Sequence, residues 1–212
     1  MRVTRLLPLS GIVFVVLVLL AIVAIGGNTP DSDASAAKVH DFYLDHDVQQ
    51  ALAAFVLAAA VPFLVLFGVA LALAVWPSGD VRRPIWEVVL IAGAGLAAGA
   101  FLVAAFIHFA LADGADVLSA EASQTLNVLD GDSWVAFNGA LGVMMLGAGG
   151  SLLPTAVFRW LGWAALVLGV ALFVPFADFF ALLLTGIWII VVSVLLYRGA
   201  GAAHRSAAPQ AA

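Results

Sequence analysis

The side chains most capable of chemistry gather between residues 40 and 47, where the sequence reads His-Asp-Phe-Tyr-Leu-Asp-His-Asp. Imidazole and carboxylate groups bind divalent metals, so His40, Asp41, His46 and Asp47 form a candidate metal site. The two histidines would point in different directions from one helix, and a third ligand would have to come from another loop. Alternatively, the acids gather at a helix N-terminus because the helix dipole favours negative charge there.

A second candidate site centres on His108, the one histidine inside a long apolar run. An ionisable side chain within a membrane segment is a functional hypothesis by default, and His108 lies near the outer end of its run. An outer polar site would join it to Asp130, Asp132, Asp178 or His46, and such a site could respond to protons. The alternative is a structural role, in which a neutral imidazole bonds to a neighbouring helix.

The composition restricts the kind of element that can position these groups. Of the 212 residues, 65% are hydrophobic and 10% are charged, with a mean hydropathy of +1.16, whereas a soluble domain carries about 25% charged residues. The chain holds 8 basic and 13 acidic residues, no cysteine and a single lysine, Lys38, in a polar stretch. This composition excludes a soluble domain, a disordered chain, a nucleic-acid binder, a thiolate metal site and a retinal protein, and no cofactor is expected.

Continuous apolar runs of the length that a membrane helix needs, about 20 residues, predict an all-α polytopic transmembrane bundle of six spans. The predicted spans are about 9–25, 48–75, 85–111, 133–152, 156–176 and 179–197. They form a single domain, 1–198, followed by a disordered cytoplasmic tail over 199–212. The first run could instead be a signal peptide, but its apolar core is longer than the usual length of about 7–15 residues, which favours a retained span.

The few charges are segregated along the chain in step with the six spans. All seven arginines fall on one side of the predicted bundle: Arg2, Arg5, Arg82, Arg83, Arg159, Arg198 and Arg205. The other side holds Lys38 and eleven acids: Asp31, Asp33, Asp41, Asp45, Asp47, Asp113, Asp116, Glu121, Asp130, Asp132 and Asp178. Because cytoplasmic loops collect Lys and Arg, we expect a multi-pass protein of the cell membrane with both termini in the cytoplasm.

Some residues within the spans have types that favour helix packing. Gly95 and Gly99 form a GxxxG pattern, which permits close helix contact either inside the bundle or between copies. Asn138 lies inside the fourth span, where an amide normally bonds to a neighbouring helix.

Three residues at the start of the fifth span have the character of a membrane anchor. Arg159 can pair with lipid phosphate at the cytoplasmic interface, where Trp160 and Trp163 share a helix face at headgroup depth. The sequence therefore predicts that these three residues fix the depth of the span.

Several segments occur in an order that resembles a known family. The run HDFYLDHD precedes a long apolar span, ASQTLNVLD precedes the fourth span, and the last two spans contain FRWLGWAALVLGVAL and LLLTGIWIIVVSVLLYRG. This order resembles the uncharacterised six-span integral membrane proteins common in actinobacteria, over residues of about 38–198. Phe158 stands where many relatives have proline. The resemblance implies a six-helix fold and brings no activity, because that family has none assigned.

Three functional hypotheses follow, and the sequence favours the first. The first is a non-enzymatic membrane module, meaning a scaffold, an accessory subunit or a sensor, with an acidic outer face. The second is a small transporter or channel for a cation or small solute, although polar residues are nearly absent from the middle of the spans. The third is an enzyme or metal site at the outer face. The expected partners are the lipid bilayer and a membrane protein or a second copy, with no nucleic acid.

Overall fold

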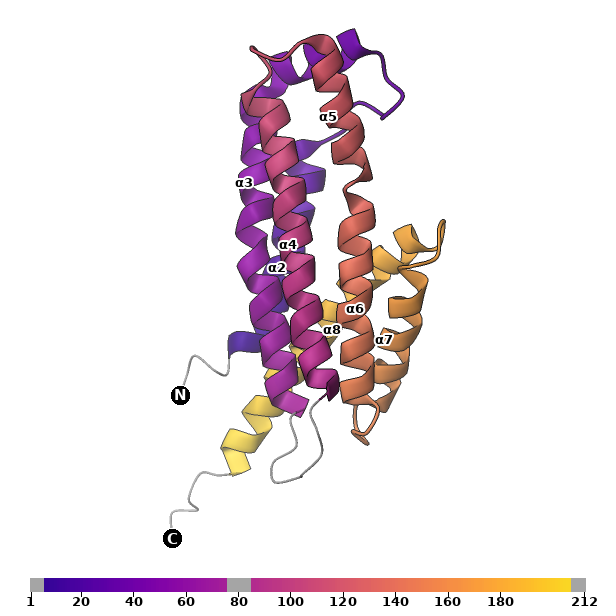
Figure 1. Ribbon diagram of the computed structural model, residues 1–212. Coiled ribbons are helices and arrows are strands. Elements are labelled where there is room, and N and C mark those ends of the chain that lie inside the picture. Colours follow the sequence, from indigo (N-terminus) through magenta and orange to yellow (C-terminus); the bar gives the residue numbers. More distant parts are fainter. Residues whose placement is uncertain (1–5, 76–84, 207–212) are drawn as a thin grey trace.

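The computed structural model describes residues 6–75 and 85–206, with side chains as far as residue 199. Within these ranges every regular element is a helix, and the helices lie side by side in an elongated bundle (Figure 1). In chain order they are the 3-10 helix η1 (Leu7–Leu9), α2 (Ser10–Leu19), the π-helix η2 (Leu20–Gly26), α3 (Ala36–Val75), α4 (Ile85–Asp113), α5 (Ala120–Asp132), α6 (Trp134–Leu152), α7 (Arg159–Ala171) and α8 (Asp178–Ser206).

Five helical segments of the described chain are long and apolar enough to cross a membrane. They are Leu7–Gly26, Ala36–Val75, Ile85–Asp113, Ala120–Leu152 and Asp178–Gly199. The predicted fifth span is represented by α7, which has 13 residues and is about 20 Å long, against a hydrocarbon thickness of about 30 Å. The fold is therefore all-helical in the described residues, and its long apolar helices are compatible with a multi-pass membrane protein.

The helices differ in length, and the longer ones project beyond the others at one end. The 40 residues of α3 span about 60 Å, the 29 residues of α4 about 43 Å, and the 19 residues of α6 only about 28 Å. Helix α5 packs on the projecting ends of α3 and α4, above α6 in Figure 1. We call this region, residues 27–47 and 108–132, the cap.

Most of the cap lies where the sequence predicts connecting segments rather than helices. The second predicted span starts at residue 48, whereas α3 already begins at Ala36 and continues through a single non-helical residue, His46 (φ −128°, ψ 19°). The acidic segment before the fourth span forms α5, whose first turn is capped by Ser119: its hydroxyl accepts a hydrogen bond from the backbone N–H of Ala122.

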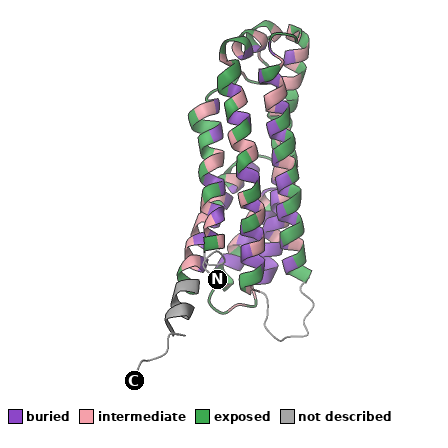
Figure 2. Ribbon diagram, turned by 90° about the vertical axis from the view of Figure 1, so that its left-hand side faces the viewer, coloured by how far each residue is buried: buried purple, intermediate pink, exposed green. Residues whose placement is uncertain are grey.

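Close contact between α4 and α6 holds the centre of the bundle together. A Cβ added at Gly93 would lie 2.3 Å from the backbone nitrogen of Met144, and one at Gly147 would lie 2.3 Å from that of Leu90. Gly95 and Gly99 make no such contact inside the bundle, because both are exposed and a Cβ at either position would meet nothing within 4 Å; contact between copies stays a prediction. Figure 2 shows the same division, with buried positions facing inward and exposed positions covering the outer faces.

The two terminal helices pack on each other as well as on α3. At Gly11 on α2, the space that a Cβ would need is filled by side chains of Phe67 and Ile189, and Phe14 lies in the core. Helix α8 continues to Ser206, so the predicted disorder of the tail is wrong from 199 to 206. The rest of that tail, 207–212, lies outside the described residues.

Candidate functional site: a histidine network in the cap

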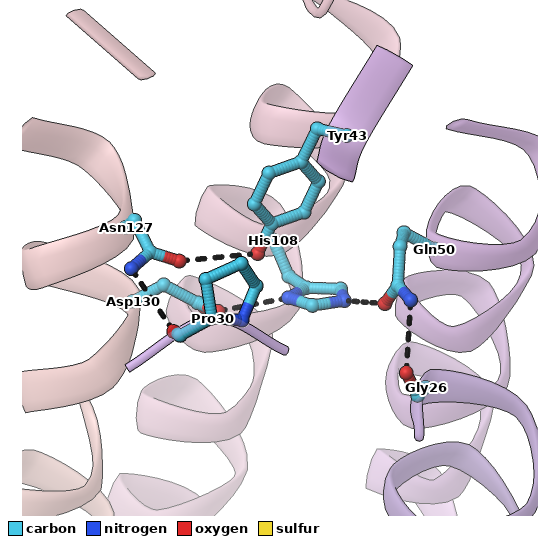
Figure 3. A network of polar contacts seen from close by, with 7 residues as sticks. All are labelled: Gly26, Pro30, Tyr43, Gln50, His108, Asn127 and Asp130. Atoms are coloured by element: carbon cyan, nitrogen blue, oxygen red, sulfur yellow. Dashed lines mark hydrogen bonds and ion pairs between the residues drawn. The ribbon is translucent and has the colours of Figure 1, made fainter. Parts of the chain in front are cut away.

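His108 is the centre of a polar network that joins three helices (Figure 3). Its Nδ1 atom lies 2.8 Å from Oδ2 of Asp130 on α5, and its Nε2 atom lies 2.9 Å from Oε1 of Gln50 on α3. The amide of Gln50 then donates from Nε2 to the backbone carbonyl of Gly26 at 2.8 Å. One imidazole from α4 therefore connects the end of the first helix, the middle of α3 and the end of α5.

A second chain of contacts lies directly above the imidazole. Tyr43 on α3 packs edge-on against the His108 ring, with 6.1 Å between ring centroids, and its hydroxyl lies 3.5 Å from Oδ1 of Asn127. Asn127 in turn donates from Nδ2 to the carbonyl of Pro30, 3.2 Å away. The loop between η2 and α3 is thus fastened to α5. It can leave η2 sharply because Gly27 adopts a positive φ of 62°.

Tyr43 stays protonated in this position. It lies in the projecting part of α3, beyond the predicted span 48–75, and its side chain is fully buried. Burial, together with the negative charge of Asp130, raises the pKa of the Tyr43 phenol. The hydroxyl therefore serves as a donor to Asn127 rather than as an acid.

The geometry around His108 suits an imidazole that carries a proton on both nitrogens. Nδ1 faces a carboxylate, which only accepts, and Nε2 faces the carbonyl oxygen of Gln50. Turning the Gln50 amide around would place its oxygen against the carbonyl of Gly26, which also only accepts. The side chains of His108 and Asp130 are 14% and 18% exposed, so their interaction is largely shielded from solvent.

The four residues of the predicted metal site are not gathered around one point. His40 Nδ1 lies 3.3 Å from the Ser123 hydroxyl, whereas His46 Nδ1 bonds to the carbonyl of Phe42 in its own helix at 2.9 Å. Asp41 and Asp47 are exposed. In the part of the chain that the structure describes, no group of three or more His, Cys, Asp or Glu residues could hold a metal ion, so the metal-site prediction gains no support.

The acid that pairs with His108 is Asp130, not Asp132 or Asp178. Asp132 follows at the end of α5 and is exposed. Asp178 lies at the start of α8, where Oδ1 accepts from the backbone N–H of Phe179 and Oδ2 accepts from Asn138 Nδ2 at 3.4 Å. Asn138 therefore links α6 to α8, as the sequence predicts for an amide inside a span.

The predicted anchor residues lie at the opposite end of the bundle from the cap. Arg159 is exposed, and its Nε donates to the carbonyl of Leu153 at 3.3 Å. Trp160 and Trp163 are 59% and 58% exposed, so their rings are free to contact lipid. Their role as a membrane anchor stays a prediction.

The sequence predicts a site at His108 with Asp130 among its candidate partners, but it does not predict the contacts of Gln50, Tyr43 and Asn127. The one available signal is that Gln50 lies at the edge of an apolar run, where an amide needs a partner.

Comparisons with protein-family models, curated proteins and solved structures give no match for the chain. The resemblance to the actinobacterial six-span proteins accordingly stays an expectation.

Proposed function

We propose that the chain is an integral protein of the cell membrane, with six membrane-embedded helices and both termini in the cytoplasm. The placement of charge supports this orientation. The start of η1, the end of α3, the start of α4, the turn between α6 and α7 and the C-terminal part of α8 lie at one end of the bundle (Figure 1). These are the segments beside the arginines, whereas the cap at the other end is acidic.

Helix α7 is the short member of this set. Its 13 helical residues are followed by Leu-Phe-Val-Pro-Phe-Ala at 172–177, which is apolar although it forms turns. The helix and these turns together supply the apolar length that a span needs. In this arrangement Trp160 and Trp163 lie at the cytoplasmic headgroups, and Phe173 and Phe176 face the outer leaflet, where both are exposed.

Within this architecture we assign the protein to the non-enzymatic modules, as a sensor of protons outside the cell. The observation that carries this assignment is that His108, at the outer end of a membrane helix, contacts Asp130 on α5 and Gln50 on α3 through its two ring nitrogens, and Gln50 extends the network to the carbonyl of Gly26. Histidine is the side chain whose charge changes most readily between pH 5 and 8. A change of its charge therefore acts on the whole cap at once.

The response follows from the acceptors around the imidazole. Loss of one proton leaves a bare ring nitrogen against either Asp130 or Gln50, and two acceptors in contact repel each other. The charged and titratable groups that face His108 are Asp130 from α5 and Tyr43 from α3, and Tyr43 keeps its proton. Deprotonation of His108 therefore loosens α5 from α3 and α4, and protonation tightens the cap.

The best-formed cavities of the described chain give no support to the transporter hypothesis. The first cavity is lined by the 27–31 loop and the start of α3, and the second lies beneath His108. The third lies between α3 and α4 near Asp47 and Asp113, and the fourth lies between α6 and α8 near Asp178. None of the four is lined by residues from the end of the bundle where the arginines lie. The outer face is thus where this protein offers space for other molecules.

A fluorescent reporter on the cap tests the sensor assignment. Val117, in the turn between α4 and α5, is 80% exposed, and the chain has no cysteine, so Val117→Cys gives a single labelling site. With a dye that is itself insensitive to pH, we expect its emission to change when the outside of a proteoliposome is stepped from about pH 8 to about pH 5.5. The change should be absent in His108→Gln.

The control for this experiment is His46→Gln. His46 also belongs to the cap, but its ring bonds only to the carbonyl of Phe42 and stacks on the Phe42 ring. The reporter should respond in His46→Gln as it does in the parent protein. An unchanged response in His108→Gln would refute the assignment.

A further inference from the structure

A cavity of about 200 Å³ lies directly beneath the histidine network. Its upper part is polar, formed by His108, Asp130, Thr29 and Ser133 together with the backbone of Gly27. Its lower part is apolar and includes Leu57, Phe101 and Phe137. A space with one polar end and one apolar end is suited to an amphiphile rather than to a water-soluble solute.

The cavity is not closed off by helices on its membrane side. Helix η2 packs on α3 and on α2, whereas α6 packs mainly on α4 and α7, and η2 and α6 share no extensive interface. Ile22 on η2 and Trp134 on α6 both line the cavity and are 53% and 40% exposed. A ligand can therefore enter sideways, between η2 and α6, from the outer leaflet of the membrane.

The depth of the cavity matches the headgroup region. Trp134 lies at the first residue of α6, where an interfacial tryptophan is expected. Phe101 is seven residues before His108 on α4, so the apolar floor lies about 10 Å below the imidazole along the helix. A lipid would thus place its head at the His108 level and the first part of its chains against the stacked rings of Phe101 and Phe137.

The negative charge of Asp130 at the polar end of the cavity determines which lipid headgroup can bind there. Oδ2 of Asp130 is bonded to His108, but no residue in the described part of the chain donates to its other oxygen, Oδ1. This atom is an acceptor with a negative charge, surrounded by a cap that carries most of the chain's acids. A head with a positive charge and N–H donors fits it, whereas an anionic head would be repelled.

The hydroxyl groups of the same cavity complete the recognition. Thr29 and Ser133 line the cavity beside Asp130 and can donate to a phosphate oxygen next to the ammonium. A quaternary ammonium would have no N–H donor for Asp130, and a primary ammonium offers three. The chemistry therefore favours a primary ammonium joined to a phosphodiester.

We propose that this cavity binds one outer-leaflet lipid with a primary ammonium headgroup, of the phosphatidylethanolamine class, with the ammonium on Asp130. The proposal rests on the membrane placement given above but not on the proton response. The lipid would join η2 to α6 across the open side of the bundle. It would also fix Asp130 from below while His108 fixes it from the side.

Thermal unfolding in detergent micelles with added lipid tests the proposal. Dioleoyl phosphatidylethanolamine should raise the melting temperature by about 3–6 °C at roughly ten times its dissociation constant. Dioleoyl phosphatidylcholine, which has no N–H donor, and dioleoyl phosphatidylglycerol, which is anionic, should each give less than half of that shift. Free ethanolamine should give none, because it lacks the chains.

Two variants and one matched control locate the effect. Asp130→Asn removes the charge, and Ala104→Leu fills the cavity from α4 while leaving the contact between His108 and Asp130 in place. Both should abolish the difference between phosphatidylethanolamine and phosphatidylcholine, whatever their own melting temperatures. Asp132→Asn, at an exposed position outside the cavity, should keep the full difference.

The outcomes of these experiments distinguish the lipid-site proposal from the proton-sensor assignment. Equal shifts with all three lipids, a full shift with free ethanolamine, or a preserved preference in both cavity variants would overturn it. The Val117 reporter can be measured in vesicles made only of phosphatidylcholine, where the proton response does not need this site. A failed lipid preference with an intact reporter response would thus refute the lipid site alone.

Discussion

Burying the imidazole of His108 costs free energy, and its contacts with neighbouring side chains offset that cost. Its imidazole lies near the cap end of the long apolar helix α4, and it is supported by a carboxylate, an amide and an edge-on aromatic ring. Each of these partners comes from a different helix or from a different turn of α3. A polar group that is satisfied in this way specifies one arrangement of the cap, because any other arrangement leaves a buried group without its bond.

Removing the acid from this network should destabilise the protein. We expect Asp130→Asn to lower the free energy of unfolding by about 1–3 kcal/mol, because a charge-assisted hydrogen bond is lost and His108 keeps no negative partner. Asp132→Asn, on the same helix and exposed, should change it by less than about 0.5 kcal/mol. Denaturant titration of both variants in micelles measures the difference, and equal effects would contradict the assigned pairing.

The sequence allowed part of this site to be predicted, and the missing part has a physical reason. His108 and Asp130 are ionisable residues beside apolar runs, so their chemistry attracts attention without a structure. Gln50 and Asn127 are neutral amides, and their role depends on which carbonyl groups the end of η2 and the loop after it bring near them. The path of that loop depends on tertiary packing, which has no local pattern.

At the scale of the helices, contact between α4 and α6 depends on glycine at two places. Gly93 and Gly147 face backbone atoms of the opposite helix, so even one methyl group would force the two helices apart. The GxxxG pattern at Gly95 and Gly99 occurs on the same helix but on its exposed side. Spacing alone could not distinguish these faces, because α4 is rich in small residues all round.

This difference gives a matched pair of substitutions two residues apart. Gly93→Ala should lower the melting temperature, since the added methyl group overlaps the backbone of Met144 and overpacking costs about 1–3 kcal/mol. Gly95→Ala should leave it unchanged or raise it slightly, because the position is open and alanine favours helix. Thermal unfolding of the two variants under one condition checks this, and a larger loss for Gly95→Ala would contradict the packing.

In both α5 and α8, a segment that the sequence predicts to be a loop or a tail is helical. Both contain segments with many small or polar residues, 120–132 and 199–206, which are typical of loops and tails. In α5 the amphipathic contact with α3 and α4 outweighs the polar composition, and Ser123 and Asn127 are buried there. Apolar periodicity is a strong signal for a span and a weak one for a helix that packs through polar side chains.

At the scale of the whole molecule, the orientation can be tested with a second pair of substitutions. Val117 precedes α5 in the cap, and Val157 lies in the turn between α6 and α7, where it is 73% exposed. In a chain without cysteine, a membrane-impermeant maleimide applied to intact cells should label Val117→Cys and spare Val157→Cys. Labelling of Val157→Cys should require permeabilised cells, and the reverse pattern would invert the orientation.

The most direct measurement follows the two ring nitrogens of His108 by ¹⁵N NMR as the pH is changed, with its signals identified from a His108→Gln sample. We predict that both nitrogens carry protons at the pH where the Val117 reporter gives its low-pH signal, which corresponds to α5 packed tightly on α3 and α4. We also predict that one proton is lost over the same pH range in which the reporter signal changes. A ring that keeps a single proton throughout, or one that titrates while the cap does not respond, would contradict the proposed proton sensor.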